Sequence, residues 1–337
     1  MFKNKKILFI APSFFGYEKN IVQEMTSLGA AVDFFDERPF KSSMAKIMNR
    51  LDLKFFIRRN INRYFDNIVS ESISRDYDFL FVISPETIDG DFVASIKDAN
   101  PNITSILYMW DSFQNKINAR KLIPHFDRVF SFDPKDHNLD SRINFLPLFY
   151  NHDFDANSCD LNQELSYSVS FAGTVHSDRV KLVKKVINQL ENNGLKTFAF
   201  FYCPSRLLFL LKKIFTKEYD FIAYSEVSFK PMSKSEIKDV FLRSSAVIDI
   251  QHPGQTGLTM RSIEMLGLQK KLVTTNESIK EYDFFDERNI FVIDRDTPSI
   301  PNDFLDSHHS TSSNDVILKY SLNNWLKSIF NFDRGLH

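Results

Sequence analysis

The sequence has only two cysteines, Cys159 and Cys203, among its 337 residues. Two cysteines at irregular positions are too few for a disulfide framework or a zinc site, and they indicate a reducing compartment such as the cytoplasm. No apolar run approaches the roughly 20 residues that a membrane-spanning helix needs. The formal net charge is −1, so the chain lacks the positive field that draws proteins to nucleic acid, and we expect no nucleic-acid partner.

The length and composition are those of a globular protein with two domains. The chain is longer than one typical domain, and 43% hydrophobic and 25% charged residues are ordinary proportions. The amino terminus is basic and then apolar, as in a signal peptide, but its apolar run from Ile7 to Pro12 is short and lacks a small-residue cleavage site. We therefore interpret this run as a first β-strand.

Glycine is also scarce, yet three of the nine glycines (Gly254, Gly257 and Gly267) fall within residues 246–276. This stretch, AVIDIQHPGQTGLTMRSIEMLGLQKKLVTTN, is typical of a buried strand, a loop, a short helix and a second strand. Glycine just before a helix lets the backbone approach a ligand closely. The helix start then offers free N–H groups and a positive dipole end. The stretch therefore predicts a binding site for a nucleoside diphosphate.

Apolar runs of strand length alternate with helical segments through the first 150 residues. This alternation predicts an α/β domain with a parallel sheet, and the region lacks the G-x-G-x-x-G pattern of a dinucleotide-binding turn. Ligands of such sheets gather at the carboxyl ends of the strands, where the sequence places Gly16, Asp111 and Asp133. The predicted strands are Lys5–Pro12, Ala30–Phe35, Asp78–Ile83, Thr104–Trp110 and Arg128–Phe132.

The alternation restarts after a polar stretch, Leu146–Glu164, which we interpret as an interdomain linker. The second half predicts another α/β domain of similar size, followed by a final helix near Asp315–Ile329. We expect domains over residues 1–150 and 165–306, and a helix within 313–332 that packs back on the first domain. The predicted strands of the second domain are Tyr167–Ala172, Lys196–Cys203, Asp220–Val227, Ala246–Ile250, Leu272–Thr275 and Asn289–Ile293.

A second turn in this half offers groups that suit a phosphate. Gly173–Thr174 is expected as a tight turn that closes a strand, and Arg179 begins the next helix. The N–H groups of such a turn and the planar guanidinium of Arg179 match phosphate oxygens. Two α/β domains joined by a polar linker would hold the nucleotide in the cleft between them.

Two segments combine basic and apolar residues. Residues 41–63 carry seven cations against the single acid Asp52, and residues 205–217 carry Arg206 and three lysines around an apolar run. Both patterns fit peripheral contact with the inner face of a cell membrane. They also fit ordinary helices that cover a core, and we favour this second interpretation.

The motif FAGTVHSDR (171–179), taken together with residues 249–276, resembles the nucleotide-binding domain of GT-B glycosyltransferases. The most similar subgroup is that of spore-maturation-type and capsule or lipopolysaccharide biosynthesis transferases. The resemblance covers residues 167–295, and the first domain matches only in its α/β layout. It implies two Rossmann-like domains facing across a cleft. It also implies sugar transfer from a nucleotide-diphosphate donor to a growing cell-surface glycan or a lipid-linked acceptor.

The resemblance also assigns roles to residues of the second domain. Glu264 falls where the family has a glutamate that hydrogen-bonds the ribose, while Arg179 and Arg261 fall where the diphosphate is contacted. His252 is a candidate contact for the donor sugar or phosphate, or else stabilises its own loop. The expected donor-binding residues are Gly173, Thr174, Arg179, His252, Gly254, Gln255, Thr256, Gly257, Leu258, Arg261 and Glu264.

One position departs from the family pattern. Many retaining GT-B enzymes carry a second acid eight residues before the ribose glutamate, and Thr256 occupies that place here. Retaining and inverting mechanisms therefore both stay open. An inverting enzyme needs a general base in the first domain. Asp111 is our candidate, with a helix N-cap as its alternative role, and Asp133 and Glu18 are weaker choices.

Enzymes of this fold generally need no bound metal, and we expect neither a metal nor a cofactor, with the nucleotide sugar acting as substrate. Two other functions fit the same two-domain layout. One is a non-hydrolysing sugar-nucleotide epimerase, against which Thr256 argues because such an enzyme needs several acids around the sugar. The other is a non-catalytic binding or assembly protein.

Overall fold

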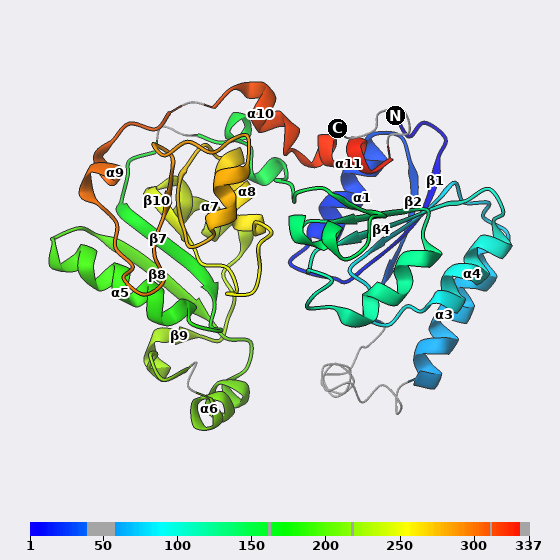
Figure 1. Cartoon of the computed structure of the whole chain (residues 1–337), viewed down its shortest axis with the longest axis horizontal. Coiled ribbons are helices and arrows are strands. Elements are labelled where there is room, and N and C mark those ends of the chain that lie inside the picture. Colours follow the sequence, from blue (N-terminus) through cyan, green and yellow to red (C-terminus); the bar gives the residue numbers. More distant parts are fainter. Residues whose placement is uncertain (39–57, 161–162, 217–218, 311, 331–337) are drawn as a thin grey trace. The chain divides into compact units, whose positions relative to one another are not determined.

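The computed structural model describes residues 1–38, 58–160, 163–216, 219–310 and 312–330 (Figure 1). The chain forms two compact units. The first consists of Met1–Pro147 and the chain from Trp325 onward, and the second is Leu148–Asn324. Each unit contains a six-stranded sheet in which every neighbouring pair of strands is parallel. The predicted α/β class with two Rossmann-like domains is confirmed.

The sheet of the first unit has the strand order β2-β1-β3-β4-β5-β6. The central strands β1 and β3 are continuous apolar runs, as expected of strands whose two faces are buried; Ile7, Leu8, Phe9 and Ile10 are all 0% exposed. The five predicted strands are present, and β6 is a sixth, three-residue strand that the sequence did not suggest. The bounds are β1 Lys6–Ala11, β2 Ala31–Asp36, β3 Phe79–Ile83, β4 Thr104–Met109, β5 Arg128–Ser131 and β6 Ile143–Phe145.

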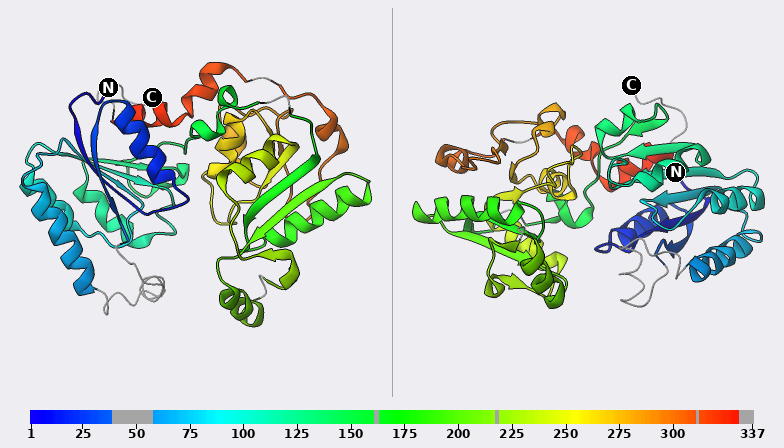
Figure 2. Two further views of the ribbon diagram at one scale, coloured as in Figure 1. Left: turned by 180° about the vertical axis from the view of Figure 1, so that it is seen from behind. Right: turned by 60° about the horizontal axis from the view of Figure 1, so that its bottom comes forward.

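Helices cover both faces of this sheet (Figures 1 and 2). On one face, Leu8, Leu80 and Leu107 of the strands form a core with residues of α3, α4 and the 3-10 helix η2. The predicted helix over residues 41–63 is described only from Arg58, so most of the segment for which membrane contact was predicted, 41–57, lies outside the described residues. The bounds are α1 Tyr17–Ser27, α3 Arg58–Ser72, α4 Gly90–Ala99, η2 Ile117–His125 and η3 Pro134–Asn138.

The opposite face of the first sheet is covered by the last helix, α11 (Leu322–Phe330). Trp325 packs edge-on against Tyr108 of β4 with ring centroids 4.8 Å apart, and Phe330 packs against Phe81 of β3 at 5.2 Å. The single helix that the sequence suggested over 315–329 is two helices, since α10 (Asn314–Lys319) ends before Tyr320. The chain breaks there because Tyr150 donates its N–H to the carbonyl of Tyr320 and accepts a hydrogen bond from the N–H of Leu322. The hydroxyl of Tyr320 also donates to the carboxylate of Asp283.

The sheet of the second unit has the strand order β12-β11-β10-β7-β8-β9. The chain runs outward from β7 to β9 and then returns to build β10 to β12 on the other side of β7. The order therefore reverses between β7 and β10, and such a switch point is where ligands of open α/β sheets bind. The bounds are β7 Tyr167–Thr174, β8 Thr197–Tyr202, β9 Val227–Ser228, β10 Ser244–Asp249, β11 Lys271–Thr274 and β12 Ile290–Val292.

The predicted strand over 220–227 is wrong except at its end, where the short β9 begins. The ammonium of Lys213 donates hydrogen bonds to the backbone carbonyls of Tyr219 (2.7 Å) and Ile222 (3.0 Å), which a strand ladder would otherwise use. Besides α10, the described helices of this unit are α5 Arg179–Asn192, α6 Arg206–Phe215, α7 Lys234–Leu242, α8 Met260–Gly267 and α9 Asn302–Asp306. Its 3-10 turns are η4 His152–Phe154, η5 Ala156–Ser158, η7 Tyr224–Glu226 and η8 Glu277–Glu281.

The first part of the stretch interpreted as a linker is packed into the second unit. Phe149 is 0% and Phe154 is 3% exposed. This packing depends on Gly267 at the end of α8, because a Cβ there would lie 2.4 Å from the carbonyl oxygen of Phe154 and 2.5 Å from the Tyr150 ring. The third glycine of the 246–276 stretch therefore serves packing and not ligand approach.

We expect Gly267→Ala to lower the free energy of unfolding by about 1–3 kcal/mol, because the added methyl group overpacks this contact. Helix propensity alone would give the opposite sign, by up to about 1 kcal/mol. Denaturant unfolding of the second unit would measure the change. Gly254→Ala is the control, since its nearest neighbour would lie 3.8 Å away. An unfolding midpoint of Gly267→Ala at or above that of wild type would contradict the prediction.

Candidate functional site

The carboxyl edge of the second sheet, at its switch point, gathers the residues for which the sequence predicted donor binding. The predicted tight turn at Gly173–Thr174 is wrong in detail, because both residues belong to β7 and pair with Phe201 and Tyr202 of β8. The turn itself comprises residues 175–178. Glycine is required at 173 because a Cβ there would lie 2.7 Å from the ring of Phe171.

Arg179, the first residue of α5, connects the ends of two neighbouring strands. Its Nε donates to the carbonyl of Ile250 (2.8 Å), and its Nη1 lies 3.4 Å from the carbonyl of Thr174. Burial, opposed by the carboxylate of Asp249, lowers the pKa of the guanidinium to about 10. Arg179 is therefore a cation at neutral pH, held between the ends of β7 and β10.

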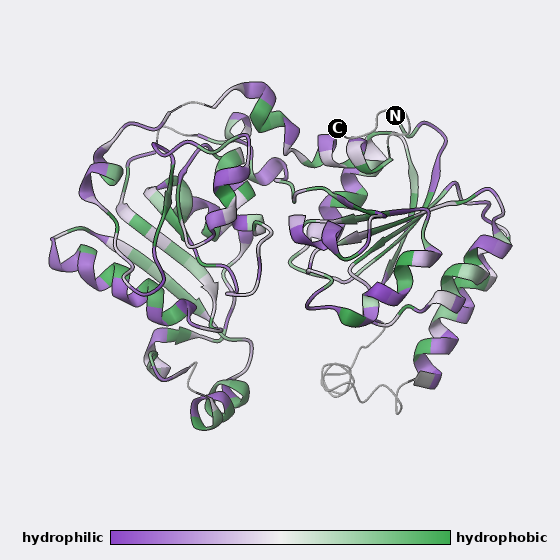
Figure 3. Ribbon diagram, viewed as in Figure 1, coloured by the Kyte–Doolittle hydropathy of each residue, from purple (hydrophilic) through white to green (hydrophobic). Residues whose placement is uncertain are grey.

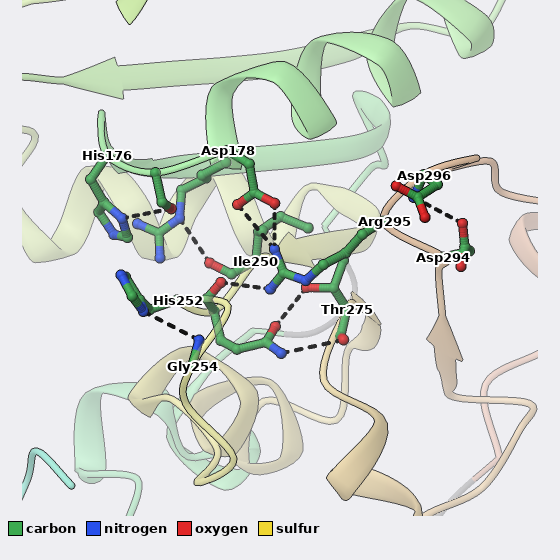
Figure 4. Close-up of polar contacts among 12 residues, drawn as sticks. His176, Asp178, Ile250, His252, Gly254, Thr275, Asp294, Arg295 and Asp296 are labelled. Carbon is green, nitrogen blue, oxygen red and sulfur yellow. Dashed lines mark hydrogen bonds and ion pairs between the residues drawn. The ribbon is translucent and has the colours of Figure 1, made fainter. Parts of the chain in front are cut away.

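A second arginine, Arg295, closes the same group of loops, and the sequence did not single it out. Its Nη1 forms an ion pair with Asp178 at 2.7 Å, and its Nη2 donates to the carbonyl of Gln251 at 2.8 Å (Figure 4). The side chain of Gln251 exchanges two hydrogen bonds with Thr275. The position of Arg295 just after a predicted strand is the signal that sequence reasoning could have used.

Asp249, the last residue of β10, fixes the start of helix α8. Its carboxylate accepts hydrogen bonds from the hydroxyls of Thr259 (2.5 Å) and Ser262 (2.8 Å). Thr259 is also the N-cap of α8 and accepts from the N–H of Ser262. A buried acid thus connects the strand to the helix N-terminus across the intervening loop. This role was also missed from the sequence.

Hydrogen bonds from neighbouring side chains hold the loop 250–258, which connects β10 to α8. The side-chain amide of Asn276 donates to the carbonyls of Thr256 (3.1 Å) and Gly257 (3.3 Å). Gln255 donates to the carbonyl of Gly257 at 2.9 Å, and Leu258 is only 1% exposed. Gly254 is exposed, and the nearest atom to a Cβ there would be Nδ1 of His252 at 3.8 Å, an ordinary contact. The fold therefore does not require glycine at this position.

Arg261 and Glu264 lie one turn apart on α8 and contact each other. The Nε of Arg261 donates to the Glu264 carboxylate at 3.3 Å, its Nη1 donates to the carbonyl of Ala172 at 3.2 Å, and its guanidinium lies over the Phe241 ring at 4.2 Å. Glu264 is 2% exposed. The two residues predicted to contact diphosphate and ribose are thus partners in this structure.

Two histidines lie at the rim of these loops (Figure 4). The rings of His176 and His252 are 6.4 Å apart with an interplanar angle of 29°. Burial, reinforced by the charges of Arg179 and His252, lowers the pKa of His176 to about 4, so this ring is neutral at pH 7. His252 is exposed and accepts a 3.4 Å hydrogen bond from the N–H of Gly254. It therefore supports its own loop.

The first unit has a separate charged cluster at the carboxyl edge of its sheet. Lys116 lies 2.7 Å from the carboxylate of Glu86 and 3.8 Å from that of Asp111. Burial opposes its charge, but the bond to Glu86 and the charge of Asp111 raise the pKa of the Lys116 ammonium. The Asp111 side chain is 53% exposed. Asp111 follows β4 and caps no helix, since α4 and η2 are capped by Asp89 and Lys116.

The other first-unit candidates have structural contacts. Asp133 is 3% exposed and caps η3 by accepting from the N–H of Lys135. Glu18 is 4% exposed and accepts from the N–H of Phe14 at 3.1 Å. Gly16 has φ 78° at the start of α1, a left-handed conformation that favours glycine. Among the candidates, Asp111 presents the most accessible carboxylate.

No family model and no curated protein matches the chain. The structure named "Trehalose-6-phosphate from E. coli bound with UDP-2-fluoro glucose" has a TM-score of 0.59 at 12% identity, covering 96% of this chain and 98% of that one. The catalytic domain of starch synthase IV from Arabidopsis thaliana, bound to ADP and acarbose, has a TM-score of 0.54 at 10% identity, with 97% and 96% covered. This chain has the GT-B fold.

The same fold is shared with a putative UDP-N-acetylglucosamine 2-epimerase from Listeria monocytogenes, at a TM-score of 0.50, 9% identity and 97% coverage of both chains. The GT-B fold therefore accommodates both kinds of protein that the sequence suggested. Within the described ranges, no group of three or more His, Cys, Asp or Glu side chains could hold a metal ion.

Glu37, just after β2, gives the first-unit cluster a pH-dependent stability. It is 0% exposed, and its Oε1 accepts from the N–H groups of Glu86 and Thr87 and from the Thr87 hydroxyl. Among the described residues, no group donates to Oε2. Burial raises the pKa of Glu37 from 4.5 to about 7.

We expect the stability of the first unit to fall by up to about 3 kcal/mol between pH 4.5 and 7. The folded state binds the Glu37 proton more tightly than the unfolded state, so this stability is present below the unfolded pKa and is lost as pH rises through the folded one. Denaturant unfolding over this range should show the fall in wild type and not in Glu37→Gln. The exposed Glu281→Gln is the control. Parallel pH profiles for wild type and Glu37→Gln would contradict the assignment.

Proposed function

We propose that this chain transfers a sugar from a nucleotide-diphosphate donor to a hydroxyl of a cell-surface glycan or lipid-linked acceptor, without a metal ion. The observation that carries the proposal is the anchored loop 250–258 at the switch point of the second sheet. Asp249 and Asn276 hold it from two sides, while Gly254 stays open. That edge is where the GT-B fold and the physics of parallel sheets favour a nucleotide.

The diphosphate would be bound by the backbone of residues 254–258, the N-terminus of α8 and two arginines. Arg179 donates from Nε and Nη1 to the carbonyls of Ile250 and Thr174. Arg261 donates from Nε to the carboxylate of Glu264 and from Nη1 to the carbonyl of Ala172. In the described part of the chain, no group accepts a hydrogen bond from the Nη2 of either residue. We assign these two Nη2 groups to phosphate oxygens, where they stabilise the charge that grows on the leaving nucleoside diphosphate.

The ribose would be held by Glu264, whose carboxylate accepts from both ribose hydroxyls. To do so it must exchange its 3.3 Å contact with Arg261 for the ribose. The exchange frees the Nε of Arg261 at the moment when the diphosphate arrives beside it. Binding of the nucleoside and neutralisation of the diphosphate are then coupled through one ion pair.

A thermal-shift screen with nucleoside diphosphates would first identify the base, because a ligand that binds only the folded state raises its apparent stability. For the nucleotide so found, we expect Glu264→Ala to weaken binding about 10-fold or more in calorimetry, since it removes a charged acceptor. The exposed Glu281→Ala in the same unit serves as control. Unchanged affinity of Glu264→Ala would rule out the ribose assignment.

Asp111 is the proposed general base that deprotonates the acceptor hydroxyl in an inverting reaction. Lys116 at 3.8 Å would hold the carboxylate in place. We expect Asp111→Asn to abolish transfer while leaving nucleotide affinity unchanged, because the substitution keeps the shape and removes the base. Asp98→Asn, on the exposed face of α4, is the control. A near-wild-type transfer rate for Asp111→Asn would reject this role.

The shared fold with the epimerase keeps one other activity as a second candidate. An epimerase would interconvert two nucleotide sugars without an acceptor, whereas a transferase releases a nucleoside diphosphate only when it transfers or hydrolyses the sugar. Analysis of products from a panel of nucleotide sugars, with and without glycan acceptors, separates the two. Absence of turnover with retained nucleotide binding would identify a non-catalytic binding protein.

A further inference from the structure

Helix α6 (Arg206–Phe215) presents its apolar side to solvent. Phe209, at 1% exposed, is its only buried residue. The sequence favoured an ordinary helix that covers the sheet, and the structure does not show this. Figure 3 shows hydrophobic and hydrophilic residues alternating along the ribbon of this helix. The outward apolar residues are Leu207 (67% exposed), Leu210 (49%), Leu211 (45%), Ile214 (73%) and Phe215 (77%).

The exposed surface continues beyond the helix. Phe221 and Tyr224, in the segment that follows, are each 47% exposed. The ring centroid of Tyr224 lies 5.8 Å from that of Phe209, so Tyr224 packs against the one buried residue of α6. Single exposed apolar residues are ordinary on protein surfaces, but a contiguous patch of this kind marks an interaction site.

Cations border the patch. Residues 205–216 contain Arg206, Lys212 and Lys213 and no acid. Lys213 is engaged by backbone carbonyls, whereas Arg206 is exposed, and Lys181 of α5 lies over the Phe221 ring at 5.2 Å. Two acids lie near the patch: Asp220 is exposed beside Phe221, and Glu226 is paired with Lys184 at 2.5 Å. Arg206, Lys212, Lys213 and Lys181 outnumber them. The border is therefore positive, and an anionic partner is favoured.

We propose that α6 docks in the plane of an anionic phospholipid bilayer, with its apolar residues among the acyl chains and its cations at the headgroups. Ten residues of helix extend about 15 Å, about half of the hydrocarbon thickness, so the helix lies on the membrane and does not cross it. No helix in the described ranges is long and apolar enough to span a bilayer. A second copy of the chain is a poorer occupant, because it would bring the same cations together.

The helix is directly connected to the donor-side loops. α6 follows the carboxyl end of β8, the neighbour of β7, and the hydroxyl of Tyr219 donates to the carbonyl of Val175 at 3.0 Å. Docking of α6 therefore brings the 175–178 turn close to the lipid surface. Resting on the proposed function, this placement favours a lipid-anchored acceptor over a free glycan.

The test is co-sedimentation of the full chain with vesicles of phosphatidylcholine alone or mixed with phosphatidylglycerol. Wild type should bind the mixed vesicles, and less so at high salt, because headgroup attraction is screened. Ile214→Glu/Phe215→Glu should lose about 100-fold in affinity, since two apolar side chains no longer enter the bilayer. Both residues are largely exposed, so the fold should be kept. Ile73→Glu/Leu318→Glu, at exposed apolar positions elsewhere (68% and 46%), is the control.

Failure of wild type to bind either vesicle, or equal binding by the α6 double variant, would overturn the proposal. A concentration-dependent dimer that the α6 double variant abolishes would overturn it in favour of a second copy. Vesicle binding needs no donor, so it stands or falls independently of sugar transfer. If transfer occurs, the double variant should keep its nucleotide affinity and its activity on a soluble acceptor, and lose activity on acceptor embedded in vesicles.

Discussion

The burial of both faces of two parallel sheets is the constraint on which the rest of this structure depends. Strands such as β1 and β3 are apolar on both faces, so each sheet must be covered by helices from both sides. Parallel strands then bring all their carboxyl ends to one edge, and the polar loops gather there. Both candidate sites, the donor loops of the second unit and the Asp111 cluster of the first, are consequences of this geometry.

At the edge of the second sheet where we propose that the donor binds, three arginines donate hydrogen bonds to the backbone. Arg179 and Arg295 donate to carbonyls of the loop after β10, and Arg261 donates to a carbonyl of β7. Their charges are matched by Asp249, Glu264 and Asp178. A site assembled this way is preorganised, since the loops are already held when a phosphate arrives. It is also nearly neutral in its side chains, so the helix dipole and the remaining N–H donors account for much of the attraction to an anion.

The glycines of residues 246–276 and of the 171–179 motif act in different ways. Gly267 allows the backbone of Phe154 to approach α8, and Gly173 in the neighbouring motif accommodates the Phe171 ring. Gly254, in contrast, has room for a Cβ at ordinary contact distance. Helix α6 shows the same dependence on surroundings, because its combination of apolar and basic residues fits a covering helix or a surface helix equally well. Which face is buried was decided by Phe209 packing among Tyr219, Tyr224 and Phe229.

The α/β class, most of the strands and the choice of residues 246–276 as a candidate site could be predicted from the sequence, because these depend on local apolar runs and on glycine and proline near them. The short strand β6, the loss of a strand over 220–227 and the break before α11 needed contacts between distant segments, such as Lys213 with Ile222 and Tyr150 with Tyr320. The same is true of Asp249, Arg295 and Asn276, whose importance lies only in what they hold. The ion pair between Arg261 and Glu264 could also be seen only in the tertiary structure, since a side chain's partner depends on packing and not on its spacing along the chain.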